Sequence, residues 1–227
     1  MASVNEWIVR EYLEALGFLV RQPRKYQVMA RAKGAYEELD LLAVNPALPQ
    51  PGALSKERIW GAAELAQVSS AIIAIRGWHS EKFTAAILAS LPDMYRFAEP
   101  EVVRLAEADL GQPNPAKILC LADLPADPDQ RAQALAFLRT RGIDGVILYR
   151  PMLLELIERI DVKRNYEKSD LLQILRILKN YDLLKSGQLE LFTPFRRRRA
   201  TPATPPVPEQ TIPLPQSLED ESSALDD

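Results

Sequence analysis

In the second half of the chain, short apolar runs alternate with segments of helix length. Residues 117–121 and 145–149 have the length and composition of strands, and residues 130–140 between them are expected to form a helix. This spacing predicts a parallel crossover, because parallel neighbours need a long connection between them. Pro151 opens a further apolar helix at residues 152–160. The alternation therefore predicts an α/β fold.

The first half predicts one helix followed by strands. Apolar residues of segment 5–16 recur at the i, i+3, i+4 and i+7 spacing of an amphipathic helix, which Gly17 is placed to end. Extended pieces are expected at residues 18–20 and 26–32. The clearest early strand covers residues 38–44, and an apolar run of strand length follows at the residues listed here: Ala71, Ile72, Ile73, Ala74 and Ile75.

Three more helices are predicted from their starting residues. Ser80 is placed to cap a helix with Phe83, Ile87 and Leu91 on one face, and Pro100 is placed in the first turn of another. The last helix is expected to begin after a Ser169 cap. Its apolar stripe is expected to face the core and consists of Leu171, Ile174, Leu175 and Leu178.

The character of the chain changes after Phe195. Seven of the 18 prolines lie between Pro194 and Pro215, and residues 219–227 are acidic. A segment of this composition cannot bury enough apolar surface to become ordered. The expected organisation is a core at 1–150, helices packed on that core at 151–190, and a disordered tail at 191–227.

Composition restricts the compartment and the partners. No stretch approaches the roughly 20 apolar residues that cross a bilayer, and no secretory signal is visible, so a cytoplasmic protein without a membrane partner is expected. The single cysteine, Cys120, excludes an internal disulfide and a thiolate metal cluster, and its apolar neighbours predict a buried thiol.

The net charge of −3 comes mostly from the tail. Residues 1–190 carry 24 basic and 25 acidic groups, whereas residues 191–227 carry four arginines and six acidic groups. A protein that binds nucleic acid through its overall charge would be basic. Any contact with DNA must therefore come from a local patch.

The order of elements resembles the PD-(D/E)XK nuclease superfamily over roughly residues 5–150. The order is a helix, a strand, a strand with Glu38-Leu39-Asp40, a strand ending in Ile75-Arg76-Gly77-Trp78, a helix and a strand. The resemblance is closest to the Holliday-junction-resolvase and restriction-enzyme branches. It implies a restriction-endonuclease-like core, with αβββαβ order and a mixed sheet flanked by helices, carrying here a C-terminal helical extension and a disordered tail.

The resemblance also implies a metal site. In those families an Asp on the second strand and an acidic residue on the third hold Mg²⁺, and a Lys two residues after that acid positions the attacking water. Some members add a Glu on the first helix, about eleven residues before the glycine that ends it. Asp40 matches the strand Asp, and Glu6 stands eleven positions before Gly17. The third strand departs from the pattern, because Ala74 stands in place of the acid and Arg76 in place of the Lys.

The resemblance therefore implies a degraded site in which Asp40, Arg76 and Glu6 are the catalytic candidates and Asp40 and Glu6 the Mg²⁺ ligands. Each residue also has a structural interpretation: Glu6 as the capping-box partner of Ser3, and Arg76 as a surface or ion-pair arginine. Arginine cannot act as a base, but its planar fork can hold a phosphate. Glu64 is a candidate substitute acid.

The neighbouring residues allow two interpretations as well. Trp78 either stacks on a base or packs in the core, and His79, the single histidine, is either a general base or a hydrogen-bonding residue. The basic run Arg196, Arg197, Arg198 and Arg199 can neutralise phosphates without sequence preference.

Three functions remain open at this point. The first is a divergent nuclease-like module that binds nucleic acid, DNA being favoured, and cuts weakly or not at all. The second is an active Mg²⁺-dependent DNA endonuclease that uses Glu6 and Asp40, with Arg76 on the scissile phosphate. The third is a protein-interaction or scaffold module whose C-terminal tail recruits a protein partner.

Overall fold

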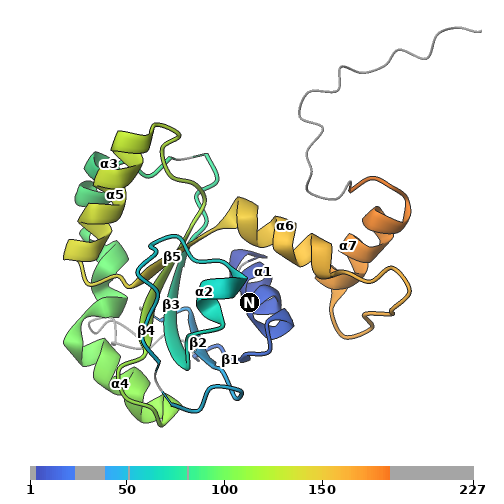
Figure 1. The fold of residues 1–227 in the computed structure, drawn as a ribbon, viewed down its shortest axis with the longest axis horizontal. Helices are drawn as coiled ribbons and strands as arrows, with labels where there is room; N and C mark the ends of the chain where they lie inside the picture. The colour runs from blue at the N-terminus through green and yellow to red at the C-terminus, as the bar shows by residue number, and fades with distance from the viewer. Residues whose placement is uncertain (1–3, 24–38, 51, 81, 185–227) are drawn as a thin grey trace, which may run out of the picture. The chain divides into compact units, whose positions relative to one another are not determined.

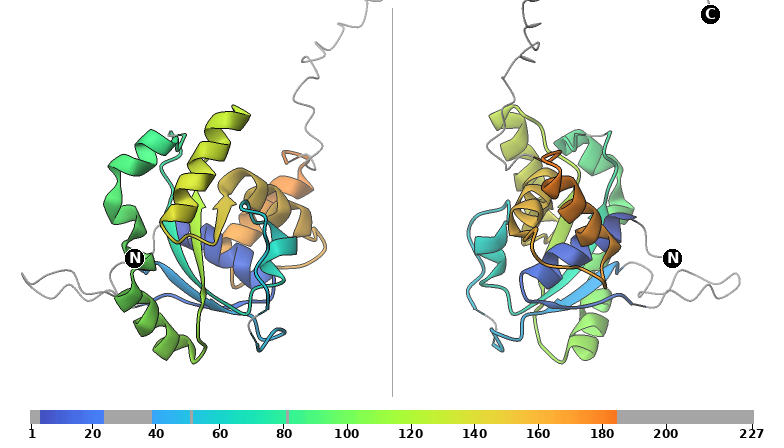
Figure 2. Two further views of the ribbon diagram at one scale, coloured as in Figure 1. Left: turned by 60° about the vertical axis from the view of Figure 1, so that its left-hand side comes forward. Right: turned by 90° about the vertical axis from the view of Figure 1, so that its right-hand side faces the viewer.

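A five-stranded mixed sheet forms the centre of the molecule, with helices on both of its faces (Figures 1 and 2). The computed structural model describes residues 4–23, 39–50, 52–80 and 82–184. The strands are β1 (Leu19–Arg21), β2 (Leu41–Val44), β3 (Ser70–Arg76), β4 (Ala116–Leu121) and β5 (Gly145–Leu148). The predicted α/β class is confirmed.

The strands lie in the order β1-β2-β3-β4-β5. The first three pair antiparallel, and β3, β4 and β5 pair parallel, so the predicted crossover between the last two strands is confirmed. The helices are α1 (Val4–Ala15), α2 (Ala62–Leu65), α3 (Ala85–Ser90), α4 (Pro100–Leu110), α5 (Pro128–Thr140), α6 (Tyr149–Arg159) and α7 (Asp170–Asn180), with a 3₁₀ helix η2 (Pro92–Ala98) between α3 and α4.

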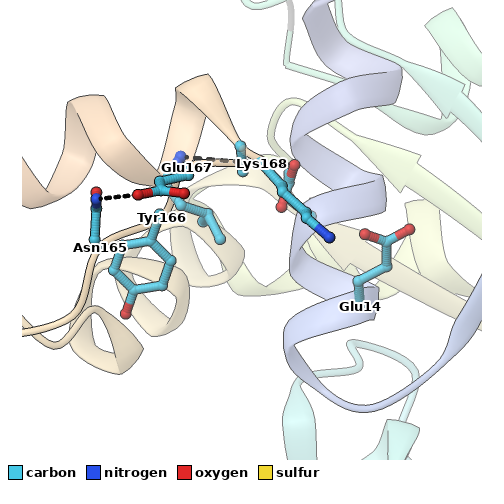
Figure 3. Close-up of a pocket in the computed structure, with 8 residues that line it drawn as sticks. Glu14, Asn165, Tyr166, Glu167 and Lys168 are labelled. Carbon is cyan, nitrogen blue, oxygen red and sulfur yellow. Dashed lines mark hydrogen bonds between the residues drawn. The ribbon is translucent and has the colours of Figure 1, made fainter.

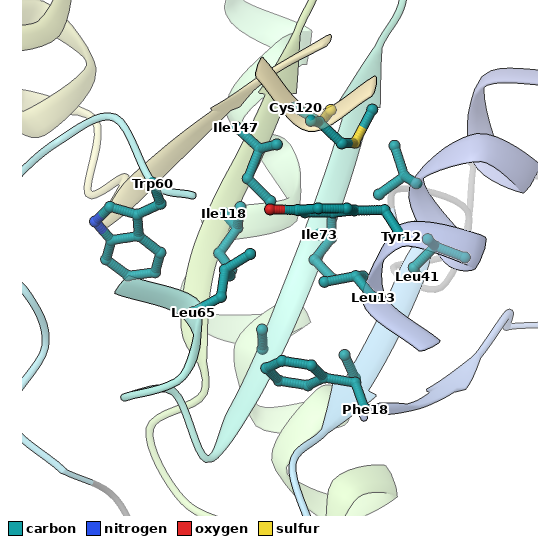
Figure 4. Packing of buried hydrophobic residues seen from close by; sticks show 14 of the residues in the cluster. Tyr12, Leu13, Phe18, Leu41, Trp60, Leu65, Ile73, Ile118, Cys120 and Ile147 are labelled. Atoms are coloured by element: carbon teal, nitrogen blue, oxygen red, sulfur yellow. The ribbon is translucent and has the colours of Figure 1, made fainter. Parts of the chain in front are cut away.

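Each face of the sheet has its own hydrophobic core. One core packs α1, α2 and α6 on the sheet, and Figure 4 shows Tyr12 and Leu13 of α1 pointing toward Ile73 and Ile118. The other core packs α3, α4, α5 and η2 on the opposite face. Because both faces are covered, β3 is buried from Ser70 to Ile75, as expected for the central strand of a sheet covered on both faces.

Local capping explains several helix ends. Pro100 occupies the first turn of α4, and Gly111 ends that helix with a φ of 65°. Ser169 caps α7 as predicted, because its Oγ accepts from the backbone N–H of Leu172 at 3.2 Å. The prediction that Ser80 caps a helix is wrong. Thr84 does so instead, with its Oγ1 accepting from Ile87 N at 3.3 Å.

The predicted orientation of the last helix is confirmed except at one residue. Leu175 is buried and Leu171 packs against the core, but Ile174 is 53% exposed, so this member of the predicted stripe lies in solvent. The helix contacts the core through Leu171, Leu172 and Leu175. A cap and a 3.6-residue period determine where a helix begins and which residues share a face, but not which face its neighbours cover.

Other boundaries differ from the predictions by a few residues. Strand β2 begins at Leu41, so Asp40 immediately precedes it, and α6 begins at Tyr149, which places Pro151 in its first turn. Cys120 is fully buried, as predicted. The predicted strand at 26–32 and the tail at 191–227 lie outside the described residues.

Among the described helices, none combines the length and the apolar character needed to cross a membrane.

Candidate functional site

The candidate site residues gather at one edge of the sheet, where the three parallel strands end. Arg76 of β3 lies beside Leu121 of β4, which in turn pairs with Leu148 of β5. Strand β2 runs in the opposite direction, so Asp40, just before its first residue, reaches the same edge. In open α/β sheets, ligands bind outside the carboxyl ends of the parallel strands.

Asp40 and Arg76 form an ion pair at this edge. The Asp40 Oδ2 atom accepts from Arg76 Nη1 at 2.9 Å and from the backbone N–H of Ile75 at 2.8 Å. The two side chains are only 9% and 18% exposed, so the pair is largely shielded from solvent. The structure thus brings together two of the three predicted catalytic residues, although their part in any reaction stays a prediction.

The ion pair orients the guanidinium through one of its nitrogens. Arg76 Nη1 donates to Asp40 and also to the carbonyl oxygen of Ile75 at 2.9 Å. In the described ranges, every hydrogen bond that Arg76 makes leaves from Nη1. The edge formed by Nε and Nη2 is the edge with which arginine holds a phosphate or a carboxylate through two parallel hydrogen bonds.

Glu6 lies in the first turn of α1 and belongs to the same neighbourhood. Its Oε2 accepts a hydrogen bond at 2.5 Å from the side-chain amide of Gln22, the residue just after β1. Burial raises the pKa of Tyr149, and Cys120, Asp40 and Glu6 raise it further through their charges. Glu6 and Asp40 therefore both act electrostatically on one phenol. The predicted capping partner of Glu6, Ser3, lies outside the described residues.

Asn5 ties the start of α1 to the end of β3. Its Nδ2 donates to the carbonyl oxygen of Gly77 at 3.5 Å, and its Oδ1 is 3.0 Å from His79 Nε2. A Cβ atom on Gly77 would overlap the Asn5 amide, which is why a glycine suits this position. The His79 ring also meets the Tyr149 ring edge-on at 4.7 Å. His79 therefore serves here as a hydrogen-bonding and packing residue.

Sequence reasoning missed Asn5, Gln22 and Tyr149. Their places in the sequence gave the best available indication, because Asn5 directly precedes Glu6 and Tyr149 directly follows β5. The partners of Asn5 are 72 and 74 positions away in the chain, and no local spacing indicates such contacts.

The described edge lacks the third-strand acid that the resembling families use for Mg²⁺. Extending the β2–β3 register by one residue places Ala74 opposite Asp40, so the position where an acid would complete the site carries a methyl group. Mg²⁺ needs carboxylate oxygens, and Asp40 Oδ2 already accepts from a guanidinium and an amide. Among the described residues, no group of three or more histidine, cysteine, aspartate or glutamate side chains could hold a metal ion.

Trp78 is not a core residue. Its side chain is 47% exposed, whereas Phe83, on which it stacks at 5.9 Å between centroids and 25° between planes, is fully buried. Of the two interpretations of Trp78, core packing is therefore wrong. Beside it lies a pocket of about 350 Å³, lined by Arg76, Trp78, Ser90, Leu91, Pro92, Asp93 and Met94.

The other predicted site residues lie elsewhere. Glu64 is in the first turn of α2, where its Oε2 accepts from Gly61 N at 2.9 Å, so it acts as a helix-capping side chain. The arginine run at 196–199 lies outside the described residues.

A larger surface pocket of about 610 Å³ lies between α1 and the start of α7 (Figure 3). Several of its polar groups are already engaged with one another. Glu11 accepts from Ser169 Oγ at 2.7 Å, and Asn165 donates to Glu167 at 2.9 Å. This pocket is therefore best understood as the junction that ties α7 to α1.

Comparison of the chain with models of known protein families, with curated proteins and with solved structures finds no match. The chemistry of the site must therefore be inferred from its own residues. Its main components are a shielded ion pair, a half-exposed tryptophan and the pocket that Arg76 and Trp78 both line.

Proposed function

We propose that this chain is a divergent restriction-endonuclease-like module that binds nucleic acid, DNA foremost, and whose metal-dependent cleavage is weak or lost. The observation that carries the proposal is the Asp40–Arg76 ion pair at the carboxyl edge of the sheet. It places a cation where a phosphate can reach it.

The arrangement of elements supports the restriction-endonuclease-like part of the proposal. Apart from the short helix α2 between β2 and β3, helix α1, three antiparallel strands, a helical connection and a fourth strand parallel to the third follow one another in αβββαβ order. Asp40 lies just before the second strand and Arg76 at the end of the third. These are the positions at which the resembling families carry their site residues.

The chemistry of the pair supports binding rather than cutting. A guanidinium beside Asp40 supplies the positive charge that a metal ion supplies in an active nuclease, and it can hold a phosphate bidentately. It cannot lower the pKa of a bound water as a metal ion does, and it cannot take a proton from that water. The site therefore keeps the means of attracting a phosphodiester but lacks a means of generating the nucleophile.

The local charge of the chain also supports binding. Residues 21–33 contain five basic side chains and no acidic one. The run at 196–199 adds four arginines. Contacts of this kind with phosphates release counterions and give salt-sensitive affinity.

The test uses the full chain with single-stranded, duplex and branched DNA, in the presence of Mg²⁺ and of Mn²⁺. We expect salt-sensitive binding without cleavage above background, and roughly tenfold weaker binding by Arg76→Gln, because a hydrogen bond to a charged group is lost. Cleavage that disappears in Asp40→Asn would instead establish an active nuclease. Absence of any DNA binding would overturn the proposal.

A protein-interaction module is the second candidate, and one observation favours it. Helix α7 exposes Ile174, Ile177 and Tyr181, which fall at i, i+3 and i+7 and form an apolar stripe on its outer side. Exposed apolar stripes of this kind are typical of helix-mediated contacts. This function becomes the better account if the full chain binds no DNA, self-associates in sedimentation, and loses that association in Ile174→Ser.

A further inference from the structure

We infer that the pocket beside Arg76 holds a single unpaired nucleobase whose phosphate lies on the Arg76 guanidinium. This inference rests on the proposed function and adds the class of nucleic acid to it: single-stranded DNA, or DNA with a base turned out of the stack. The observations that carry it are the half-exposed Trp78 ring, the pocket that it borders, and the distribution of charge along that pocket.

The pocket has the size and the lining of a ligand site. Its volume of about 350 Å³ is within the range of roughly 300–1,000 Å³ that is typical of small-molecule sites. It lies between the end of β3 and the start of η2, on the face of the sheet covered by α3, α4 and α5. Leu91, Pro92 and Met94 provide an apolar wall, as a flat heterocycle requires.

Trp78 provides a fixed stacking surface. Its ring lies 5.9 Å from the Phe83 ring at an interplanar angle of 25°, and Phe83 is fully buried. One face of the indole is therefore supported from within the protein, while the side chain as a whole keeps 47% of its surface exposed. Aromatic side chains held in this way are the usual platforms on which proteins stack unpaired bases.

The charged side chains at the pocket indicate where the phosphate and where the base of a nucleotide would lie. Arg76 lines one part of the pocket and can hold the phosphate through its Nε–Nη2 edge. Asp93, in the first turn of η2, contributes an exposed carboxylate. That carboxylate repels a phosphate but accepts from the amino group of a base such as cytosine. A nucleotide matches this distribution because its phosphate is anionic and its base is a neutral donor.

The geometry points to unpaired substrates. In a duplex, both faces of each base are stacked on neighbouring bases, so Trp78 could not stack on it. A base that enters the pocket must first leave the stack, and this costs least in a single strand. We therefore expect the full chain to prefer single-stranded DNA to a duplex of the same sequence.

The experiment measures the affinity of the full chain for a fluorescently labelled single strand and for the matching blunt duplex, by anisotropy. Trp78→Ala is expected to weaken single-strand binding roughly tenfold and to leave duplex binding within twofold, because stacking is lost. Trp78→Phe is the matched control and should keep most of the affinity, since it retains an aromatic face. Melting temperatures verify that each variant is folded.

A second arm compares oligo-dC with oligo-dT. The wild-type chain should favour oligo-dC, and Asp93→Asn should narrow that preference, because thymine has no exocyclic amino group to donate to the carboxylate. A preference that is unchanged by Asp93→Asn would overturn the role of this carboxylate.

The outcomes separate this inference from the function on which it rests. If the wild-type chain binds neither DNA, both fail. If it binds DNA with salt-sensitive affinity, and Trp78→Ala leaves the preference for single strands unchanged, the base pocket is wrong and the proposed function stands. A wild-type chain that binds the duplex as tightly as the single strand would likewise overturn the base pocket alone.

Discussion

Glu155 and Asp40 are both largely shielded from solvent, but their hydrogen-bond donors differ, and so do their roles in the structure. Glu155 Oε2 accepts from the Tyr12 hydroxyl at 2.5 Å and from the backbone N–H of Ala62 at 3.2 Å, and so it ties α6 to α1 and α2. Both of these donors are neutral. Asp40 accepts from a backbone amide and from Arg76, a cation with a further donor edge. The first carboxylate holds helices together, whereas the second orients a charge at the edge of the sheet.

The two carboxylates also differ in what surrounds them. Near Glu155, the Trp60 ring packs so closely on Gly145 that a Cβ atom there would overlap it. Near Asp40, the crowded glycine is Gly77, and the group that a Cβ would meet is the side-chain amide of Asn5, which can rotate away. We therefore regard the first region as a rigid part of the core and the second as an adaptable surface.

The largest effect predicted from this comparison is that of Gly145→Ala. The added methyl group would overlap the buried Trp60 ring, and we expect a loss of about 3 kcal/mol in the free energy of unfolding. Gly77→Ala, the matched substitution at the other region, should cost about 1 kcal/mol or less because Asn5 can move. Urea denaturation measures both, and equal losses would remove the distinction between a rigid and an adaptable region.

The second prediction separates stability from binding. Tyr12→Phe and Arg76→Gln should each cost about 2 kcal/mol of stability, because each deprives a sheltered carboxylate of a strong donor. Only Arg76→Gln should weaken DNA binding, which is measured by anisotropy on the same samples. A comparable loss of DNA affinity in Tyr12→Phe would mean that the Glu155 region is not purely structural.

The third prediction concerns alkaline pH. Burial raises the pKa of Tyr12 and Tyr149, the phenols near the two carboxylates, and raises that of Tyr95 to about 12. Between pH 10 and pH 12, the unfolded chain loses these protons while the folded chain keeps them. The free energy of unfolding should therefore fall, by about 1.4 kcal/mol per pH unit for each such tyrosine.

Burial also raises the pKa of Cys120, so the fall should begin near pH 9, at the ordinary pKa of a thiol. Tyr95→Phe removes one phenol that lies in neither carboxylate region and should make the decline less steep. Stability that stays constant from pH 9 to pH 12 would contradict the burial of these groups.

The smallest predicted effect is that of Ile174→Ser on the outer side of α7. Since Ile174 is 53% exposed, we expect the stability to change by no more than about 0.5 kcal/mol. Leu175→Ala on the same helix, at a buried position, should cost about 2 kcal/mol. If Ile174→Ser were the more damaging substitution, Ile174 would face the core as the sequence pattern first indicated.

The sequence predicted the sheet better than it predicted the site. Strands at 117–121 and 145–149 were recognisable because both faces of the sheet are covered, which makes their residues apolar apart from Lys117. The helix caps were less certain, since Ser80 and Thr84 are equally suitable cap residues and only the backbone geometry selects Thr84.

At the site, the resemblance to a nuclease pattern predicted that Asp40 and Arg76 would meet, and the structure brings them together. It could not predict Asp93, which reaches the pocket from a 3₁₀ helix that no periodicity indicated. Nor could it determine the exposure of Trp78, because this depends on the position of Phe83 beneath the ring. Contacts between distant segments and the degree of burial of a single side chain are properties of the packed molecule.

The most direct test of the central claim, that Arg76 presents its guanidinium to a phosphate, is the salt dependence of single-stranded DNA binding. The logarithm of the affinity is plotted against the logarithm of the salt concentration for the wild-type chain and for Arg76→Gln. Loss of one phosphate contact should lower the magnitude of the slope by about 0.7. An identical slope for the two proteins would show that Arg76 contacts no phosphate and would contradict the account.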